Sequence, residues 1–127
     1  MQDKKMKTVM IVDDSRIMRK IVKNTFELLK IPARYLEAED GNQALMHLST
    51  QKADLILLDW NMPNLSGIDF LKQLRTMEEY KETPVIMVTS EAARLNVVEA
   101  IRAGATSYIT KPINDNVFME KLSKIDF

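Results

Sequence analysis

Residues 55–63 read Leu-Ile-Leu-Leu-Asp-Trp-Asn-Met-Pro, and this stretch decides the fold. Four consecutive aliphatic residues lead to Asp59, and Pro63 ends the segment. An apolar run of this length is typical of a strand that is buried on both faces, as inside a parallel sheet. Ligand chemistry gathers at the carboxyl ends of the strands in such sheets, so Asp59 is a candidate functional residue. Many strands also end in Asp simply to begin a turn, so Asp59 alone identifies no site.

The rest of the chain alternates between strand and helix patterns. Short apolar segments predict four further strands, at Thr8–Val12, Tyr35–Ala38, Val85–Val88 and Tyr108–Thr110. The first predicted helix follows a capping residue, Ser15, and has one apolar face made of Ile17, Ile21 and Leu28, with Met18, Val22 and Leu29. Five strands that alternate with helices through short links predict an α/β fold, a doubly wound (βα)5 parallel sheet with helices on both faces.

The later helices carry start and stop signals. Asp40–Gln43 resembles a capping box, Ser66 opens a helix, Gly104 is placed to end one, and Asn114 is placed to cap the last. The residues expected to face the core or form an apolar stripe are Ala44, Leu45, Leu48, Ile68, Leu71, Leu74, Leu95, Val98, Ile101, Phe118, Leu122 and Ile125.

Composition limits the classes of function. The 127 residues are 46% hydrophobic, which suits one domain over residues 1–127. Lys plus Arg and Asp plus Glu both number 18, so no net positive charge draws the chain to nucleic acid or to a membrane surface. The chain has no cysteine, which excludes disulfides and thiolate metal sites. The apolar run Val9–Val12 is too short for a signal peptide, and we expect a cytoplasmic protein.

Polar residues follow several of the predicted strands. Asp13 and Asp14 follow the first, Asp59 the third, Thr89 the fourth and Lys111 the fifth. If the strands are parallel, all five residues lie at one edge of the sheet. Three neighbouring carboxylates resist joint ionisation unless a cation lies among them, and Mg²⁺ suits such oxygen ligands. A hydroxyl and an ammonium group bind phosphate oxygens, so the pattern indicates a phosphoryl site with a carboxylate nucleophile.

Each residue also has an ordinary structural interpretation. Asp13 and Asp14 before a helix can be N-terminal caps, and Thr89 and Lys111 can be turn or surface residues. His47 is the only histidine, and we expect it at the surface, away from the acids. The functional interpretation depends on all five strand-end residues having one consistent register.

The motifs of the chain resemble those of the response-regulator receiver family. They are Val12-Asp13-Asp14-Ser15, Asp59-Trp60-Asn61-Met62-Pro63, Val88-Thr89-Ser90-Glu91 and Lys111-Pro112. The resemblance extends from about Lys7 to about Leu122 and is strongest to single-domain chemotaxis regulators of the CheY type. It implies a flavodoxin-like sheet with strand order 2-1-3-4-5, the order known for that type.

The resemblance also implies a role for each motif residue. Asp59 would accept a phosphoryl group from a histidine kinase, and Mg²⁺ would be held by Asp13, Asp14, Asp59 and the backbone carbonyl of Asn61. Thr89 and Lys111 would contact the phosphoryl group. Tyr108 would reorient with Thr89 in a switch. Asn61 and Glu91 would tune hydrolysis of the acyl phosphate.

The same resemblance implies the partners. They are a chemotaxis-type histidine kinase, a flagellar motor switch protein and a phosphatase, bound by a monomer with no output domain of its own. The surface that changes would lie near Arg94, Tyr108 and Lys121. Ser90, Ala93 and Ile113 depart from the chemotaxis type outside the phosphorylation chemistry, so they bear on the downstream partner.

Three alternatives stay open. A phosphorelay intermediate would pass the phosphoryl group to a second histidine domain. An aspartyl-phosphate phosphohydrolase of the haloacid dehalogenase type needs an acid two residues after the nucleophile, where this chain has Asn61. A nucleotide-binding domain needs a glycine-rich loop, and Asp14-Ser15-Arg16-Ile17 has no glycine.

Overall fold

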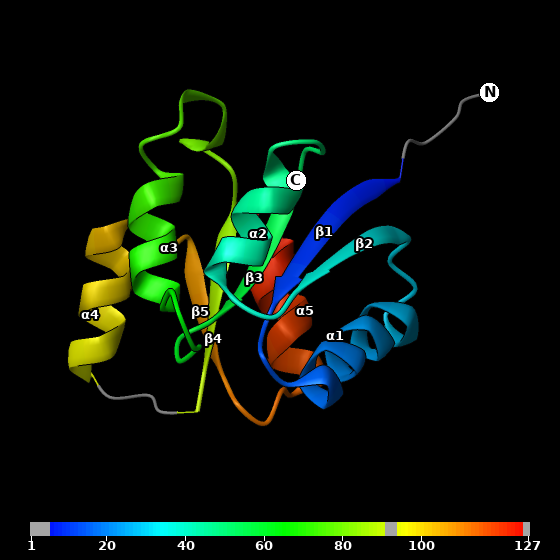
Figure 1. The fold of residues 1–127 in the computed structure, drawn as a ribbon. Coiled ribbons are helices and arrows are strands. Elements are labelled where there is room, and N and C mark those ends of the chain that lie inside the picture. The colour runs from blue at the N-terminus through cyan, green and yellow to red at the C-terminus, as the bar shows by residue number, and fades with distance from the viewer. Residues whose placement is uncertain (1–5, 91–93, 126–127) are drawn as a thin grey trace.

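The computed structural model describes residues 6–90 and 94–125. Within these residues, five strands alternate with five α-helices and one short 3₁₀ helix (Figure 1). In chain order they are β1 (Lys7–Val12), α1 (Arg16–Leu28), β2 (Ala33–Ala38), α2 (Gly41–Leu48), β3 (Leu55–Asp59), α3 (Gly67–Leu74), η1 (Glu78–Tyr80), β4 (Val85–Thr89), α4 (Arg94–Ala103), β5 (Ser107–Thr110) and α5 (Asp115–Ser123).

The five strands form one parallel sheet in the order β2-β1-β3-β4-β5, so the predicted fold class and strand order are confirmed. Val12 pairs with Leu58, and Asp59 pairs with Val88. The carboxyl ends of β1, β3 and β4 therefore lie at the same edge of the sheet. That edge is where open α/β sheets bind ligands.

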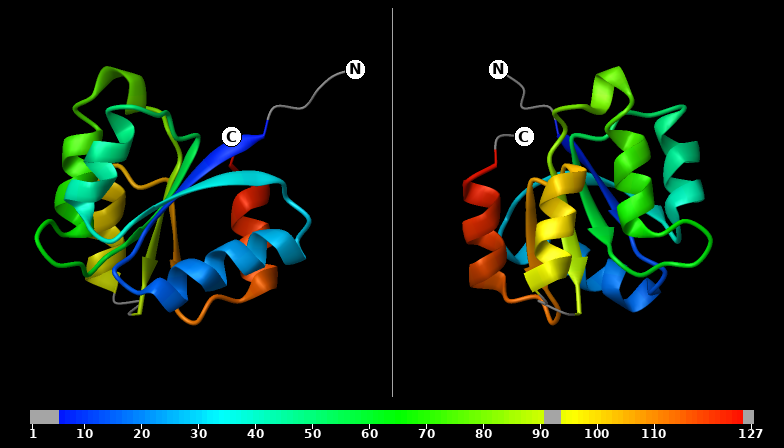
Figure 2. Two further views of the ribbon diagram at one scale, coloured as in Figure 1. Left: turned by 45° about the vertical axis from the view of Figure 1, so that its right-hand side comes forward. Right: turned by 90° about the vertical axis from the view of Figure 1, so that its left-hand side faces the viewer.

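Two apolar clusters hold the layers together, one on each face of the sheet. On one face α1 and α5 pack against it, and on the other α2, α3 and α4 do so (Figure 2). Within β3, Leu55 and Leu57 belong to the first cluster, and Ile56 and Leu58 belong to the second. Because successive side chains of a strand point to opposite faces, a sheet covered on both sides needs an uninterrupted apolar run.

The predicted helix signals are present. The side chains of Ser15, Ser66 and Asn114 accept hydrogen bonds from the backbone N–H three residues later, at 3.0–3.2 Å. Gly104 ends α4 with a φ of 111°, a conformation that glycine adopts without a Cβ clash. Asp40 accepts from the N–H of Gln43 at 2.9 Å, but the Gln43 side chain accepts from Glu39. This arrangement is therefore shifted by one residue from a reciprocal capping box.

The predicted apolar face of α1 is partly wrong. Ile17 and Leu28 are 74% and 69% exposed, and Ile21 is also exposed. Val22 is buried as predicted, and Phe26, which was not assigned to that face, is buried as well. The ring of Phe26 packs edge-on against Phe118 of α5, with centroids 5.3 Å apart, so contact with α5 helps to select the buried face.

Smaller differences concern single residues and element ends. β2 begins at Ala33, two residues before the predicted start, and α5 ends before Ile125, which packs partly buried against the core. Val98 and Ile101 of the predicted α4 stripe are exposed. His47 is not a free surface residue, because its Nε2 lies 2.8 Å from the backbone oxygen of Glu37. Among residues 6–90 and 94–125, no helix is both long and apolar enough to cross a bilayer.

Candidate functional site

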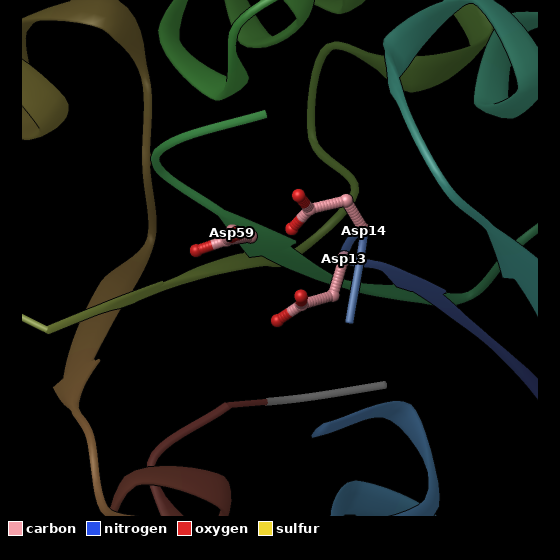
Figure 3. Close-up of side chains that lie close together, drawn as sticks. All are labelled: Asp13, Asp14 and Asp59. Atoms are coloured by element: carbon pink, nitrogen blue, oxygen red, sulfur yellow. The ribbon is translucent and has the colours of Figure 1, made fainter. Parts of the chain in front are cut away.

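Three carboxylates meet at the carboxyl edge of the sheet. Asp13 and Asp14 follow β1, and Asp59 is the last residue of the neighbouring strand β3 (Figure 3). One oxygen from each carboxylate lies within 4.8 Å of the other two. Asp13 and Asp59 are only 4% and 6% exposed, whereas Asp14 is exposed. The sequence thus correctly predicted that these three acids lie together.

Lys111 brings a positive charge into this cluster. Its Nζ lies 3.2 Å from Oδ1 of Asp59 and 3.3 Å from Oδ2 of Asp13. Burial alone would lower the pKa of Lys111, but the two carboxylates outweigh burial and raise it. Lys111 therefore remains an ammonium group at neutral pH and can bind an anion.

Asp59 has an unusual protonation equilibrium. Burial raises the pKa of Asp59 to about 6, and the negative charge of Asp13 adds to this effect. Lys111 acts in the opposite direction through its charge and its hydrogen bond. The ionised form of such a carboxylate is poorly solvated and only partly compensated, so a cation bound beside it would stabilise it.

The donor set fits a hard divalent cation. Three carboxylates and one ammonium leave an excess of negative charge in a partly buried space, and all the acidic ligands are oxygens. Mg²⁺ binds through one or two carboxylates and keeps several waters, so an exposed member such as Asp14 is compatible with it. In the described part of the chain, no other group of three acids meets this geometry. Asn61 lies exposed in the loop after β3.

Thr89 and Tyr108 lie on neighbouring strands beside the acids. Thr89 is the last residue of β4 and is buried, and its backbone oxygen accepts a hydrogen bond from the N–H of Lys111 at 2.7 Å. Both side chains line a small apolar cavity of about 10 Å³, together with Trp60, Met87, Val97 and Ala100. Tyr108 is only partly buried, and the Nζ of Lys121 lies 4.8 Å from the centre of its ring. Glu91 and Ala93 lie outside the described residues.

Gly67 is a structural requirement of the site that sequence reasoning missed. Its N–H donates to the backbone oxygen of Trp60 at 3.1 Å, and a Cβ at this position would lie 2.1 Å from the backbone oxygen of Asp59. The start of α3 can therefore fold back onto the end of β3 only if residue 67 has no side chain. A glycine immediately after a helix-capping serine was the available signal.

The loop between Asp59 and Gly67 has a second constraint. Asn64 has a φ of 68°, and its Nδ2 donates to Oδ2 of Asp40 at 2.8 Å. The pKa of Asp40 is lowered, first by the hydrogen bond from the Gln43 backbone and then by the one from Asn64. Asp40 thus joins the start of α2 to the loop that carries Asn61.

Comparisons with known proteins agree with this geometry. Residues 9–123 match the model of the response regulator receiver domain. The chain is 43% identical to the chemotaxis protein CheY of Pseudomonas aeruginosa, over 92% of this chain and 94% of the relative. It is 46% identical to CheY-3 of Vibrio cholerae, over 92% and 89%.

A solved structure supports the same assignment. The chemotaxis protein CheY4 of Vibrio cholerae superposes with a TM-score of 0.86 at 33% identity, covering 96% of this chain and 100% of that one. Its similarity spans the whole sheet and its helices. The chain therefore belongs to the response regulator receiver family, as a receiver domain of the CheY type.

Proposed function

We propose that Asp59 accepts a phosphoryl group from the phosphohistidine of a histidine kinase, and that this modification switches a partner-binding surface. The observation that carries the proposal is the environment of Asp59. It is a buried carboxylate in contact with Lys111, beside two further carboxylates, at the sheet edge. The similarity to chemotaxis proteins of the CheY type supports it.

The proposed reaction transfers a phosphoryl group from a histidine nitrogen to a carboxylate oxygen of Asp59. An oxygen of ionised Asp59 bonds to phosphorus, the bond from phosphorus to the histidine nitrogen breaks, and the leaving imidazole keeps the electron pair and takes a proton from water. Lys111 and Thr89 bind the phosphoryl oxygens. Asp13 and Asp14, with Asp59 and the backbone carbonyl of Asn61, would hold Mg²⁺, which supplies positive charge where those oxygens arrive.

The switch involves Thr89 and Tyr108. The cavity that they line with four other residues is about 10 Å³, far too small for a phenol ring, so Tyr108 can turn inward only if a lining side chain moves. In this proposal the side chain that moves is Thr89. A phosphoryl group that hydrogen-bonds to Thr89 draws this hydroxyl toward Asp59 and makes that space. Inward rotation also removes the Tyr108 ring from Lys121, which alters the surface formed by α4, β5 and α5.

The proposal includes the wider setting of the protein. Residues 1–127 act as one receiver domain in the cytoplasm, monomeric, without contact to nucleic acid or membrane. The partners are a chemotaxis-type histidine kinase, a flagellar motor switch protein and a phosphatase. The chain is not an enzyme toward other substrates and catalyses only its own phosphorylation and dephosphorylation, with Asn61 and Glu91 tuning the rate of hydrolysis.

Two other outputs are distinguishable by experiment. A phosphorelay intermediate would transfer the phosphoryl group to a second histidine domain, whereas a motor regulator would bind a motor-switch peptide more tightly when phosphorylated. A phosphohydrolase would release phosphate catalytically from an external ester. The side chain two residues after Asp59 is an amide, Asn61, which cannot serve as the general acid that this reaction requires.

The proposal is tested by incubation with Mg²⁺ and a small acyl-phosphate donor, followed by intact mass measurement. We expect the mass to increase by one phosphoryl group, and the increase to disappear when EDTA replaces Mg²⁺. A second sample with Asp59→Asn should show no increase while its circular dichroism stays native. A full mass increase in the Asn variant would remove Asp59 as the acceptor.

A further inference from the structure

We propose that Arg19 is a positioning residue for the metal and phosphoryl site, because its guanidinium holds the backbone from which Asp13 and Asp14 project. This inference rests on the proposed function, since it concerns Mg²⁺ binding at the same acids. Arg19 was not among the residues that the sequence motifs indicated.

The guanidinium of Arg19 connects the segment after β1 to strand β2. Arg19 lies on α1 and is only 9% exposed. Its Nη1 donates to the backbone oxygen of Asp13 at 2.6 Å, and its Nε donates to Oε1 of Glu37 on β2 at 2.9 Å. Both are charge-assisted hydrogen bonds, which are short and stronger than bonds between neutral groups.

Glu37 gives Arg19 a fixed anchor. The other carboxylate oxygen of Glu37 accepts from Lys23 at 2.8 Å, and its backbone oxygen lies 2.8 Å from Nε2 of His47. The hydrogen bond from Lys23 is the main reason that the pKa of Glu37 is lowered, so this anchor stays ionised at neutral pH. Glu37 is thus held from α1 and from α2 at once.

The carbonyl that Arg19 binds belongs to the peptide group that joins Asp13 to Asp14. Rotation of this peptide would move both acids relative to Asp59. The Asp13 carboxylate is itself placed through Oδ1, which accepts from the N–H of Ser15 at 2.8 Å, and through Oδ2, which lies 3.3 Å from Lys111. The position of this carbonyl, together with these two contacts, therefore helps to keep the three acidic oxygens close enough to share a cation.

A purely structural role for Arg19 makes a different prediction. In that case Arg19 only satisfies a buried carbonyl, and its loss lowers the free energy of unfolding without changing metal affinity in the folded protein. Its charge makes a third prediction, because removal of a cation near an acidic site should strengthen Mg²⁺ binding. Positioning predicts the opposite sign, since partners that orient metal ligands typically contribute about 10–100-fold in affinity.

The test uses Mg²⁺ alone, with emission from Trp60, the only tryptophan, as the readout beside the site. We expect Arg19→Gln to weaken Mg²⁺ binding by about 10-fold or more. Arg19→Lys keeps the charge but lacks the planar fork that reaches both partners, so it should weaken binding to a similar extent. Asp14→Asn, which removes a proposed ligand, serves as the positive control.

Lys23→Gln is the matched control. It removes a cation from the same helix that binds the same Glu37, but Lys23 has no hydrogen bond to Asp13 among the described contacts. Its Mg²⁺ affinity should fall much less than that of Arg19→Gln, because Glu37 keeps its hydrogen bond to Arg19 and a half-exposed charge is well screened. Equal weakening in Lys23→Gln and Arg19→Gln would overturn the assignment to Arg19.

A double-mutant cycle with Glu37→Gln supplies an independent test. If Glu37 acts through Arg19, Glu37→Gln weakens Mg²⁺ binding in the wild type and has no further effect in Arg19→Lys. Glu37 is half-exposed, so this variant tests the inference even if Arg19→Gln does not fold. Wild-type protein that does not bind Mg²⁺ would refute the proposed function, whereas unchanged or stronger binding in the folded Arg19 variants would refute the positioning role alone.

Discussion

The folded protein disfavours the ionised form of Asp59, and this lowers the free energy of unfolding at neutral pH. Its pKa is raised to about 6, primarily by burial and then by the charge of Asp13. In the unfolded chain an aspartate ionises near its ordinary value of about 3.9. Between these two values the folded state binds more protons than the unfolded state, so stability decreases as the pH rises through this interval.

Asp59→Asn should therefore stabilise the metal-free protein at neutral pH. The full pKa shift corresponds to about 3 kcal/mol, and loss of one ion-pair partner of Lys111 offsets part of it, so we expect a net gain of roughly 1–2 kcal/mol. Urea unfolding in EDTA at about pH 4 and about pH 7.5 measures this, and the gain should be much smaller at the lower pH.

Saturating Mg²⁺ is the control for that comparison. It should stabilise the wild type more than the Asn variant, because a neutral amide binds the cation less well and ligand binding stabilises only the form that binds. A wild type that is more stable than Asp59→Asn at neutral pH in EDTA would contradict the expected gain.

The acids of the site could be predicted from the sequence, but the residues that hold them could not. Asp13, Asp59 and Lys111 follow strands, and parallel strands bring their carboxyl ends to one edge. In the sequence, Arg19 is one of several cations in a predicted helix. Only the structure shows that its guanidinium contacts the Asp13 carbonyl. Gly67 becomes necessary only through a clash with a backbone atom eight residues earlier.

At the scale of elements, helical periodicity alone does not predict which face of α1 is buried. Its predicted apolar face combines two adjacent stripes with helical spacing, Ile17, Ile21 and Leu28 beside Met18, Val22 and Leu29. The structure buries Val22 and Phe26 and leaves Ile17 and Leu28 exposed, because the helix packs beside α5 on the same face of the sheet. Which stripe is buried depends on a neighbour more than 80 residues later in the chain, which helical periodicity does not report.

The junction of β3 and α3 should be sensitive to a single methyl group. A Cβ on Gly67 would meet the Asp59 backbone oxygen at 2.1 Å, and neither backbone segment can yield without moving the candidate acceptor. We expect Gly67→Ala to lower the free energy of unfolding by roughly 1–3 kcal/mol or more, as measured by urea denaturation. It should also weaken Mg²⁺ binding.

Gly41→Ala is the comparison for this variant. Its added Cβ would approach Cδ2, Cγ and Cβ of Leu65 at 2.7–3.0 Å, and rotation of that side chain relieves the two shorter contacts. Gly41 also lies in the first turn of α2, where alanine is tolerated. A loss in Gly41→Ala as large as that in Gly67→Ala would indicate a general cost of replacing glycine and not the contact with Asp59.

At the scale of the whole molecule, a change at Asp59 must reach a surface on α4, β5 and α5. The proposed route uses Thr89, the small cavity and Tyr108, which lie side by side. The strand order that places β4 between Asp59 and Tyr108 came from resemblance to a known family, because the alternation of strands and helices alone does not fix it.

Coupling between the phosphoryl site at Asp59 and the peptide-binding surface on α4, β5 and α5 should be reciprocal. A phosphoryl mimic such as beryllofluoride should tighten binding of a motor-switch peptide by about 5–150-fold, and the peptide should tighten binding of the mimic by the same factor. Thr89→Ala should reduce both effects together, as measured by paired titrations, because it removes the hydroxyl that joins the sites.

Thr110→Ala is the matched control for that experiment. Thr110 is the residue of β5 that pairs with Thr89, and it is only half-buried. Its substitution should leave the coupling intact. The Thr89–Tyr108 switch is refuted if the mimic does not change the peptide affinity, or if the coupling in Thr89→Ala equals that of the wild type.

If one carboxylate, Asp59, carries the phosphoryl group, the most direct measurement is to locate the modified residue. Protein treated with Mg²⁺ and a small acyl-phosphate donor is reduced with borohydride, which converts an aspartyl phosphate to homoserine, and its peptides are then sequenced by mass spectrometry. We expect homoserine at residue 59 alone, and none when EDTA replaces Mg²⁺. Homoserine at residue 13 or 14, or equal conversion of residue 59 without Mg²⁺, would contradict it.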